Sequence, residues 1–530
     1  GNYAAPINNG NGNLVNADYS DAMIVGRDSN AFSANFNGSG RTISNVSIDV
    51  IVNHNNDLSV GVFGDVKLNG KLISDLNIDK IKINVEGNMN QVNIGSLYGV
   101  GDASSGVLQN IQLNGVAING KNIEGCIGGL LGSQKNLMSF ENISISDISI
   151  NHNNDNTSSE SIKIGGFAGQ IEPNNISNMI DYENIFIRNV DIVNVDIVTG
   201  NSIQAYLVGF AGQARNVSKI YLDDIKIRQE KTNNTSTKEA GIGGLLGTGD
   251  GTIQNITIKN VDLFVGSGKT ENSTFGVGGL IGTTSILGFS YSTYIDNIIM
   301  ENFTFDKGFS GLGNYAYPAV AGGIVGTSYA SITIKNVTAS NFDFTNASKW
   351  GNVVTASVIA STSPMWSSGI VHVFENIALN NFVNPIGIFA GYLSDNTTIN
   401  NVVIHVVGKN NTNWWGSYFA QESVSATTIN INNSYILFDN KGLYDIFEDR
   451  AQYNVNNVHF YVKDGAKYKY QANYVSETNA IEQDKVNIHY WTADESKYDD
   501  FLKLVISQNN SGGAFESNKI VNIGDDSNPI

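Results

Sequence analysis

Two carboxylates in one stretch of the chain, Asp191 and Asp196, are the residue type that general acid and base catalysis requires. Enzymes that cut polysaccharides place two such acids close together, because one donates a proton while the other accepts one or attacks. The neighbouring stretches show no basic residue aligned with either acid. A carbohydrate-active enzyme is therefore kept as an alternative, and we assign no catalytic residue.

Metal and nucleotide sites also have little support in the sequence. The chain lacks the H-E-x-x-H pattern of zinc proteases. The segment "GTGDGT" (Gly247–Thr252) lacks the Lys-Ser/Thr pair of a phosphate-binding loop. We expect its glycines and aspartate to form a turn. The single cysteine, Cys126, is expected to be buried. No metal or cofactor is predicted. The histidines lie far apart, at His54, His152, His372, His405, His459 and His489.

Aromatic residues offer a better case for binding. Four of the five tryptophans, Trp350, Trp366, Trp414 and Trp415, lie late in the chain. Exposed Trp and Tyr rings anchor many interfaces, because each has an apolar face and a polar edge. We predict a ligand-binding patch of Trp366, Trp414, Trp415 and Tyr418. The alternative is that these rings fill an irregular core.

The charge balance excludes several classes of partner. The net charge is −18 and the sequence pI about 4.7. Nucleic acid and anionic membranes attract basic surfaces, so neither is an expected partner. No apolar run reaches the length that a membrane-spanning helix needs.

A glycine motif recurs along the sequence. Each copy joins apolar residues to two or three glycines, and the interval between copies is roughly 25 to 42 residues, which is typical of repeat architectures. The clear copies are "IGGLLG" (Ile127–Gly132), "IGGFAG" (Ile164–Gly169), "LVGFAG" (Leu207–Gly212), "IGGLLG" (Ile242–Gly247), "VGGLIG" (Val277–Gly282) and "AGGIVG" (Ala321–Gly326).

A second phrase alternates with the glycine motif. It starts with Asn or Asp and continues with aliphatic residues at every second position, as in "NIFIRNVDI" from Asn184 and "NITIKNVDL" from Asn255. This period of two is typical of half-buried strands and excludes helical repeats. The phase breaks at Asn189 and Asn194 indicate corners or bulges. The glycine motif itself is expected to be a deeply buried strand, whose glycines permit close approach or positive φ.

These repeats predict an all-β fold, a parallel β-solenoid of about 12 coils with caps at both ends, most simply a right-handed β-helix. Asparagine is the commonest residue at 74, and stacked coils would align it in side-chain ladders. A propeller fits less well, since its blades need four strands each. We predict an N-terminal cap at 1–44, the repetitive solenoid at 45–440 and a C-terminal cap at 441–530 with one short helix at Thr492–Ser507.

The motif G-G-hydrophobic-hydrophobic-G resembles the GLUG repeat of bacterial surface proteins, most clearly at Gly128–Gly132, Gly165–Gly169 and Gly243–Gly247. The Asn-rich solenoid also looks like the passenger domains of autotransporter adhesins, including those of the Campylobacter and Helicobacter group. The resemblance covers roughly residues 45 to 460. It implies export and display on the bacterial cell surface. Any membrane contact would be made by an anchor or barrel outside these residues.

We therefore expect an extracellular adhesin that is not an enzyme and needs no cofactor. Its expected partner is a host-cell glycan or glycoprotein, and self-association through strand edges is a further expectation. The alternatives are a β-helix carbohydrate-active enzyme and a structural stalk that binds nothing.

Overall fold

The computed structural model describes residues 3–6, 24–26 and 30–491, with gaps in the last range. The gaps are 53–57, 103–104, 137, 154–160, 173–179, 200–203, 235–238, 271–273, 285–291, 307–318, 348–352, 363–369, 386, 394, 408–419, 424–426, 440–442, 448–451, 464–466 and 472–485. The predicted helix at Thr492–Ser507 lies outside the described residues.

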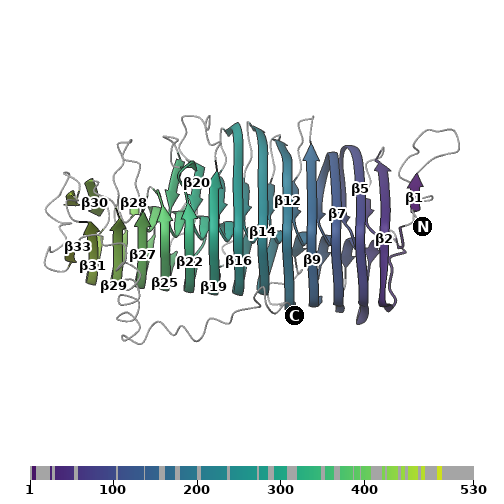
Figure 1. Cartoon of the computed structure of the whole chain (residues 1–530), viewed down its shortest axis with the longest axis horizontal. Coiled ribbons are helices and arrows are strands. Elements are labelled where there is room, and N and C mark those ends of the chain that lie inside the picture. Colours follow the sequence, from purple (N-terminus) through teal and green to yellow (C-terminus); the bar gives the residue numbers. More distant parts are fainter. Residues whose placement is uncertain are drawn as a thin grey trace.

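The regular elements of the described chain are all strands, and 31 of them belong to one sheet. Every pairing in it is parallel, as the register of successive strands shows for β14 (Ala211–Asn234) on β16 (Leu246–Thr270). Figure 1 shows the long strands side by side in chain order, from β2 (Phe36–Ile51) to β33 (Val486–Trp491). The predicted parallel β-solenoid is confirmed.

Each coil contains one long strand, and fourteen such strands follow one another in the described part of the chain. The remaining bounds are β5 (Lys71–Gly95), β7 (Gly106–Gly128), β9 (Ser139–Asn153), β12 (Asp181–Thr199), β19 (Thr293–Asp306), β22 (Ile332–Asp343), β25 (Val371–Val383), β27 (Asn396–Val407), β29 (Thr428–Asp439) and β31 (Gln452–Lys463).

Short strands complete the coils. They are β3 (Leu58–Val60), β4 (Phe63–Val66), β6 (Tyr98–Asp102), β8 (Leu131–Lys135), β10 (Ile162–Gly165), β11 (Ala168–Glu172), β13 (Gln204–Val208), β15 (Glu239–Gly243), β17 (Thr274–Gly278), β18 (Ile281–Thr284), β20 (Ala319–Gly322), β21 (Val325–Ser328), β23 (Val353–Ala356), β24 (Ile359–Thr362), β26 (Ala390–Leu393) and β28 (Ala420–Ser423). Outside this pattern lie β1 (Tyr3–Pro6), which pairs with β2, and the separate pair β30 (Leu443–Phe447) and β32 (Lys467–Gln471).

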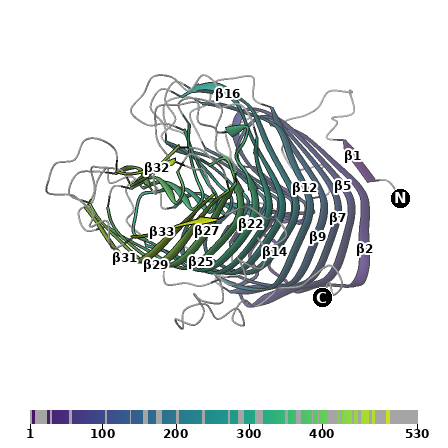
Figure 2. The same ribbon diagram turned by 60° about the vertical axis from the view of Figure 1, so that its left-hand side comes forward.

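The long strands from β2 to β25 bend at two corners five residues apart, and β27, β29 and β31 bend at the first corner alone. The strands bend together along the rod (Figure 2). Both corners have positive φ, a conformation that Asn and Asp tolerate better than most residues. The first corner is occupied by Gly40, Asp75, Asn110, Asn142, Asn184, Lys219, Asn255, Asn297, Asn336, Asn376, Asn401, Asn433 and Asn457. The second is occupied by Asn45, Lys80, Gly115, Asp147, Asn189, Asp224, Asn260, Asn302, Asn341 and Asn381.

Side-chain hydrogen bonds join these corners from coil to coil. The Asn302 amide donates to Asn260 at 2.9 Å and accepts from Asn341 at 2.9 Å. Asn381 continues the ladder by donating to Asn341 at 2.8 Å. The predicted asparagine ladders are thus confirmed. In them, each side-chain amide finds its hydrogen-bond partners in the coils before and after its own.

The glycine motif is a buried bend between the end of one strand and the start of the next, so burial is confirmed and the expectation of one continuous strand was wrong. In "IGGLLG" of the third coil, β7 ends at Gly128 and β8 begins at Leu131. A Cβ at Gly129 would overlap the carbonyl oxygen of Gly166 in the next coil. These glycines lack positive φ, so close backbone approach alone requires them.

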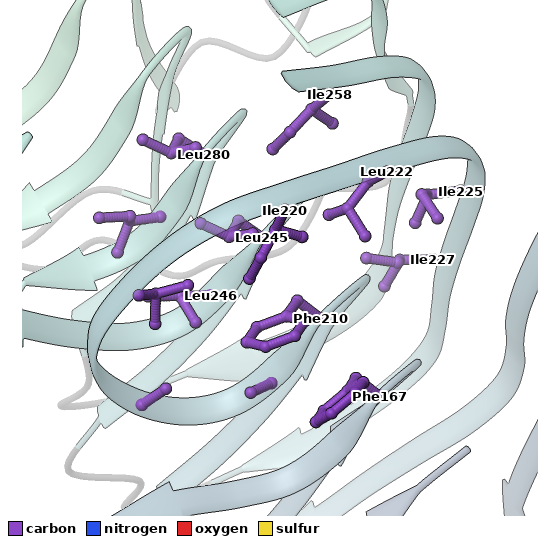
Figure 3. Packing of buried hydrophobic residues seen from close by; sticks show 14 of the residues in the cluster. Phe167, Phe210, Ile220, Leu222, Ile225, Ile227, Leu245, Leu246, Ile258 and Leu280 are labelled. Atoms are coloured by element: carbon purple, nitrogen blue, oxygen red, sulfur yellow. The ribbon is translucent and has the colours of Figure 1, made fainter. Parts of the chain in front are cut away.

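The core fills the space between the bends and the long strands. Figure 3 shows Phe167 and Phe210 from two bends pointing into the same interior as Ile220 and Leu222 of β14. All four are fully buried. Further along, the Phe303, Phe342 and Phe382 rings stack with centroids 4.5 and 4.4 Å apart.

The predicted domain limits stay predictions, but two strands bear on them. β2 runs from Phe36 to Ile51 and so crosses the proposed limit at residue 44. Parallel stacking continues past residue 440 through β31 and β33.

We expect Gly166→Ala to lower the midpoint of thermal unfolding more than Gly40→Ala does. A Cβ at Gly166 would overlap the Gly209 carbonyl oxygen, whereas one at Gly40 meets nothing within 4 Å and carries only the strain of its positive φ. Overpacking of this kind costs about 1–3 kcal/mol. Circular dichroism measures both midpoints, and equal shifts would contradict the role given to the motif.

The corner ladder is tested at Asn302. Asn302→Gly loses the two amide bonds but tolerates the positive φ, whereas Asn302→Ala also strains the backbone by about 1–2 kcal/mol. We expect thermal midpoints in the order wild type, Gly variant, Ala variant. An Ala variant as stable as the Gly variant would show that left-handed geometry does not select the corner residue.

Candidate functional site

The predicted aromatic patch cannot be placed. Trp366, Trp414, Trp415 and Tyr418 all lie outside the described residues, as does Trp350. The patch therefore stays a prediction.

The described chain has a different exposed patch on its outer surface, just before the first corner. We call it the Tyr294 face and define it as Tyr294, Asp296, Thr333, Lys335, Val371, Val373 and Glu375, from β19, β22 and β25. Strand alternation produces it, because the intervening Ile295, Ile334 and Phe374 point inward and are fully buried.

Tyr294 and Val371 give this face its apolar character. Tyr294 is 37% exposed and Val371 45%, and with Val25 they are the exposed large hydrophobic residues of the described chain. The Tyr294 hydroxyl donates to Asp296 at 3.4 Å. Partial burial and the Asp296 charge raise the pKa of Tyr294, so the phenol stays neutral at physiological pH.

A charged triple lies beside the tyrosine. The register places Asp296, Lys335 and Glu375 in line on three successive coils. Lys335 Nζ lies 2.6 Å from Glu375 Oε2, and both side chains are about one-third exposed. The hydrogen bond to Glu375 is the main cause of a raised pKa at Lys335, despite the opposing effect of partial burial.

This triple is an acid–base–acid arrangement that sequence reasoning missed. The signal was the residue directly before the corner asparagine, which reads Asp-Asn, Lys-Asn and Glu-Asn in the three coils. A lysine acting as general base needs a lowered pKa, whereas Lys335 has a raised one. The geometry is therefore better suited to holding a polar ligand than to taking a proton from it.

Of the two acids Asp191 and Asp196, the structure describes the side chain of Asp191 only. Asp191 lies 3.9 Å from Lys226 of the next coil, so the statement that no basic residue aligns with it was wrong. The two residues sit at the same register position although they are 35 positions apart. The Asp196 side chain lies outside the described part of the chain.

The "GTGDGT" segment belongs to β16 instead of a free turn. Arg215 Nε lies 2.8 Å from Asp250 Oδ1, and the Asp250 side chain is only 5% exposed. Burial raises the pKa of Asp250, and the Arg215 charge opposes this effect. The pair ends a column of alternating charge over five coils. Asp102 pairs with Lys135 and Lys135 with Glu172, and Glu172 and Arg215 directly follow the paired residues Ile171 and Ala214.

The histidine side chains that the structure describes, those of His152, His372 and His405, are buried. His152 Nε2 lies 3.0 Å from the Ile123 carbonyl oxygen, and His405 Nδ1 lies 3.0 Å from Asn380 Oδ1. His372 is fully buried, with Nε2 3.5 Å from Asp395. Cys126 is buried as predicted, which raises the pKa of its thiol. The described residues contain no cluster of three metal-ligating side chains.

No protein family, curated protein or solved structure matches this chain. Within the described residues, no helix has the length and hydropathy to cross a bilayer.

The Lys335–Glu375 pair is tested by acetylation of lysines at pH 9. The raised pKa leaves less free amine at Lys335, so we expect faster acetylation of Lys335 in Glu375→Gln than in the wild type. Mass spectrometry of the Lys335 peptide measures the rate, with the distant Lys80 as internal reference. An unchanged rate would contradict the interaction.

Proposed function

We propose that this chain is a surface-displayed bacterial adhesin, in which a β-solenoid rod presents the Tyr294 face to a glycan or glycoprotein of a host cell. The observation that carries the proposal is the exposed tyrosine beside a stacked row of charged side chains on a rigid sheet. A tyrosine ring can stack on the apolar face of a sugar, while carboxylates and a lysine bond its hydroxyls.

The surrounding structure supports this function. The ladder spacing fixes the side chains of successive coils about 4.8 Å apart, so little conformational freedom is lost when a ligand binds. The net charge of −18 disfavours acidic partners and is consistent with a neutral or basic one. The resemblance of the glycine motif to GLUG repeats supports export and display on the cell surface.

A carbohydrate-active enzyme is the second candidate, because Asp296, Lys335 and Glu375 form an acid–base–acid row on one face. The raised pKa of Lys335 weighs against it, since that lysine remains a cation at neutral pH. Release of reducing ends from a polysaccharide would distinguish this candidate from a binding protein.

The adhesin proposal is tested on a glycan and extracellular-matrix array. We expect the wild type to bind, Tyr294→Ala to lose at least about tenfold in affinity and Tyr294→Phe to keep most of it, because the ring provides the stacking surface. Val25→Ser removes another exposed hydrophobic residue elsewhere, 49% exposed against 37% for Tyr294, and serves as the control.

A triple variant of Trp366, Trp414 and Trp415 to Ala is measured beside it. Loss of binding in that variant alone would move the binding site from the Tyr294 face to the aromatic patch. Absence of binding by the wild type would favour the structural stalk.

A further inference from the structure

A pocket of about 300 Å³ opens at the edge of the third to fifth coils, away from the Tyr294 face. Its lining comes from the start of β7, β9 and β12 and from the turn before β5. The lining residues are Gly70, Ser105, Gly106, Val107, Met138, Ser139 and Asp181.

The pocket exists because of a glycine in a column of larger residues. Gly106 lies four residues before the first corner, a position that Met138, Ile180, Ile332 and His372 occupy in later coils with buried side chains and where Gly251 is a second glycine. Gly70 adds open space, since a Cβ there would meet only the Ser105 hydroxyl, 3.8 Å away.

The walls of the pocket differ in chemistry. Val107 gives the pocket an apolar side that is partly exposed, whereas Met138 is only 3% exposed and its sulfur lies 3.6 Å from the buried Tyr98 hydroxyl. Ser105 and Ser139 contribute hydroxyl groups. A small polyol with one apolar face matches this combination of surfaces.

Asp181 determines the charge of the ligand. Its carboxylate is exposed at the pocket and has no hydrogen-bond or ion-pair partner among the residues that the structure describes. Most other acids on this sheet are paired, as Glu183 is with Lys219 and Glu86 with Lys121. An unpaired carboxylate beside an apolar wall attracts a protonated amine, and the net charge of −18 strengthens that attraction.

We propose that this pocket binds an amino sugar, a single pyranose ring whose protonated amine bonds to Asp181. The ring's C–H face lies on Val107, and its hydroxyls bond to Ser105 and Ser139. The pocket lies about four coils, or about 19 Å, from Tyr294, so it is a separate site and does not depend on the proposed function.

The test is titration calorimetry of the full chain with glucosamine, N-acetylglucosamine and cadaverine. We expect glucosamine to bind at least about tenfold more tightly than N-acetylglucosamine, whose amine is uncharged, and than cadaverine, which lacks the ring. Asp181→Asn should weaken glucosamine at least about tenfold, whereas Glu86→Gln, which removes the same charge outside the pocket, should leave it unchanged.

Two further variants show whether the sugar binds in the pocket or on the Tyr294 face. Gly106→Val should fill the pocket and abolish binding, with circular dichroism reporting whether the coils remain folded. Tyr294→Ala should bind glucosamine as the wild type does, so failure of the adhesin proposal and failure of this one are distinguishable. Absence of glucosamine binding, an unaffected Asp181→Asn variant, or equal binding of cadaverine would each overturn the proposal.

Discussion

The left-handed corner is the constraint on which the rest of this structure depends. Every coil from β2 to β31 turns through positive φ at the same register position, and mostly with asparagine. Asparagine meets two demands there, since it tolerates the backbone angle and bonds to its equivalent in the next coil. Hydrogen bonds from Asn110, Ser74 and Asn37 even hold the pKa of the corner residue Asp75 below its usual value. The corners therefore set which side chains face inward and which form the Tyr294 face.

The glycine bend on the opposite side of the coil obeys a different rule. At Gly129 and Gly166 it is the neighbouring coil's carbonyl that leaves no room for a side chain, and φ is ordinary. Close approach brings Phe167 and Phe210 into contact with the long strands, where they complete the core. One side of the coil is thus fixed by backbone angle and the other by backbone distance.

The sequence predicted the fold well because both features repeat. Alternation after Asn184 and Asn255 revealed the strands. Of the two predicted phase breaks, Asn189 is a residue of the second corner, and Asn194 has positive φ but lies beyond both corners. The candidate site was harder to predict. Asp296, Lys335 and Glu375 are about 40 positions apart, and only the coil register brings them into line. The pocket at Gly106 was equally hidden, because it arises from a missing side chain instead of a motif.

The column of alternating charge from Asp102 to Asp250 has a consequence for how such a chain can change in length. Each of its members has a neighbour of opposite sign in the adjoining coil. Deleting the coil of Glu172 would bring Lys135 against Arg215, two like charges in a partly buried row. Deleting two adjoining coils would restore the alternation. Within this segment, we expect insertion or deletion of two coils to cost less stability than insertion or deletion of one, because only an even number of coils preserves the alternation of charge.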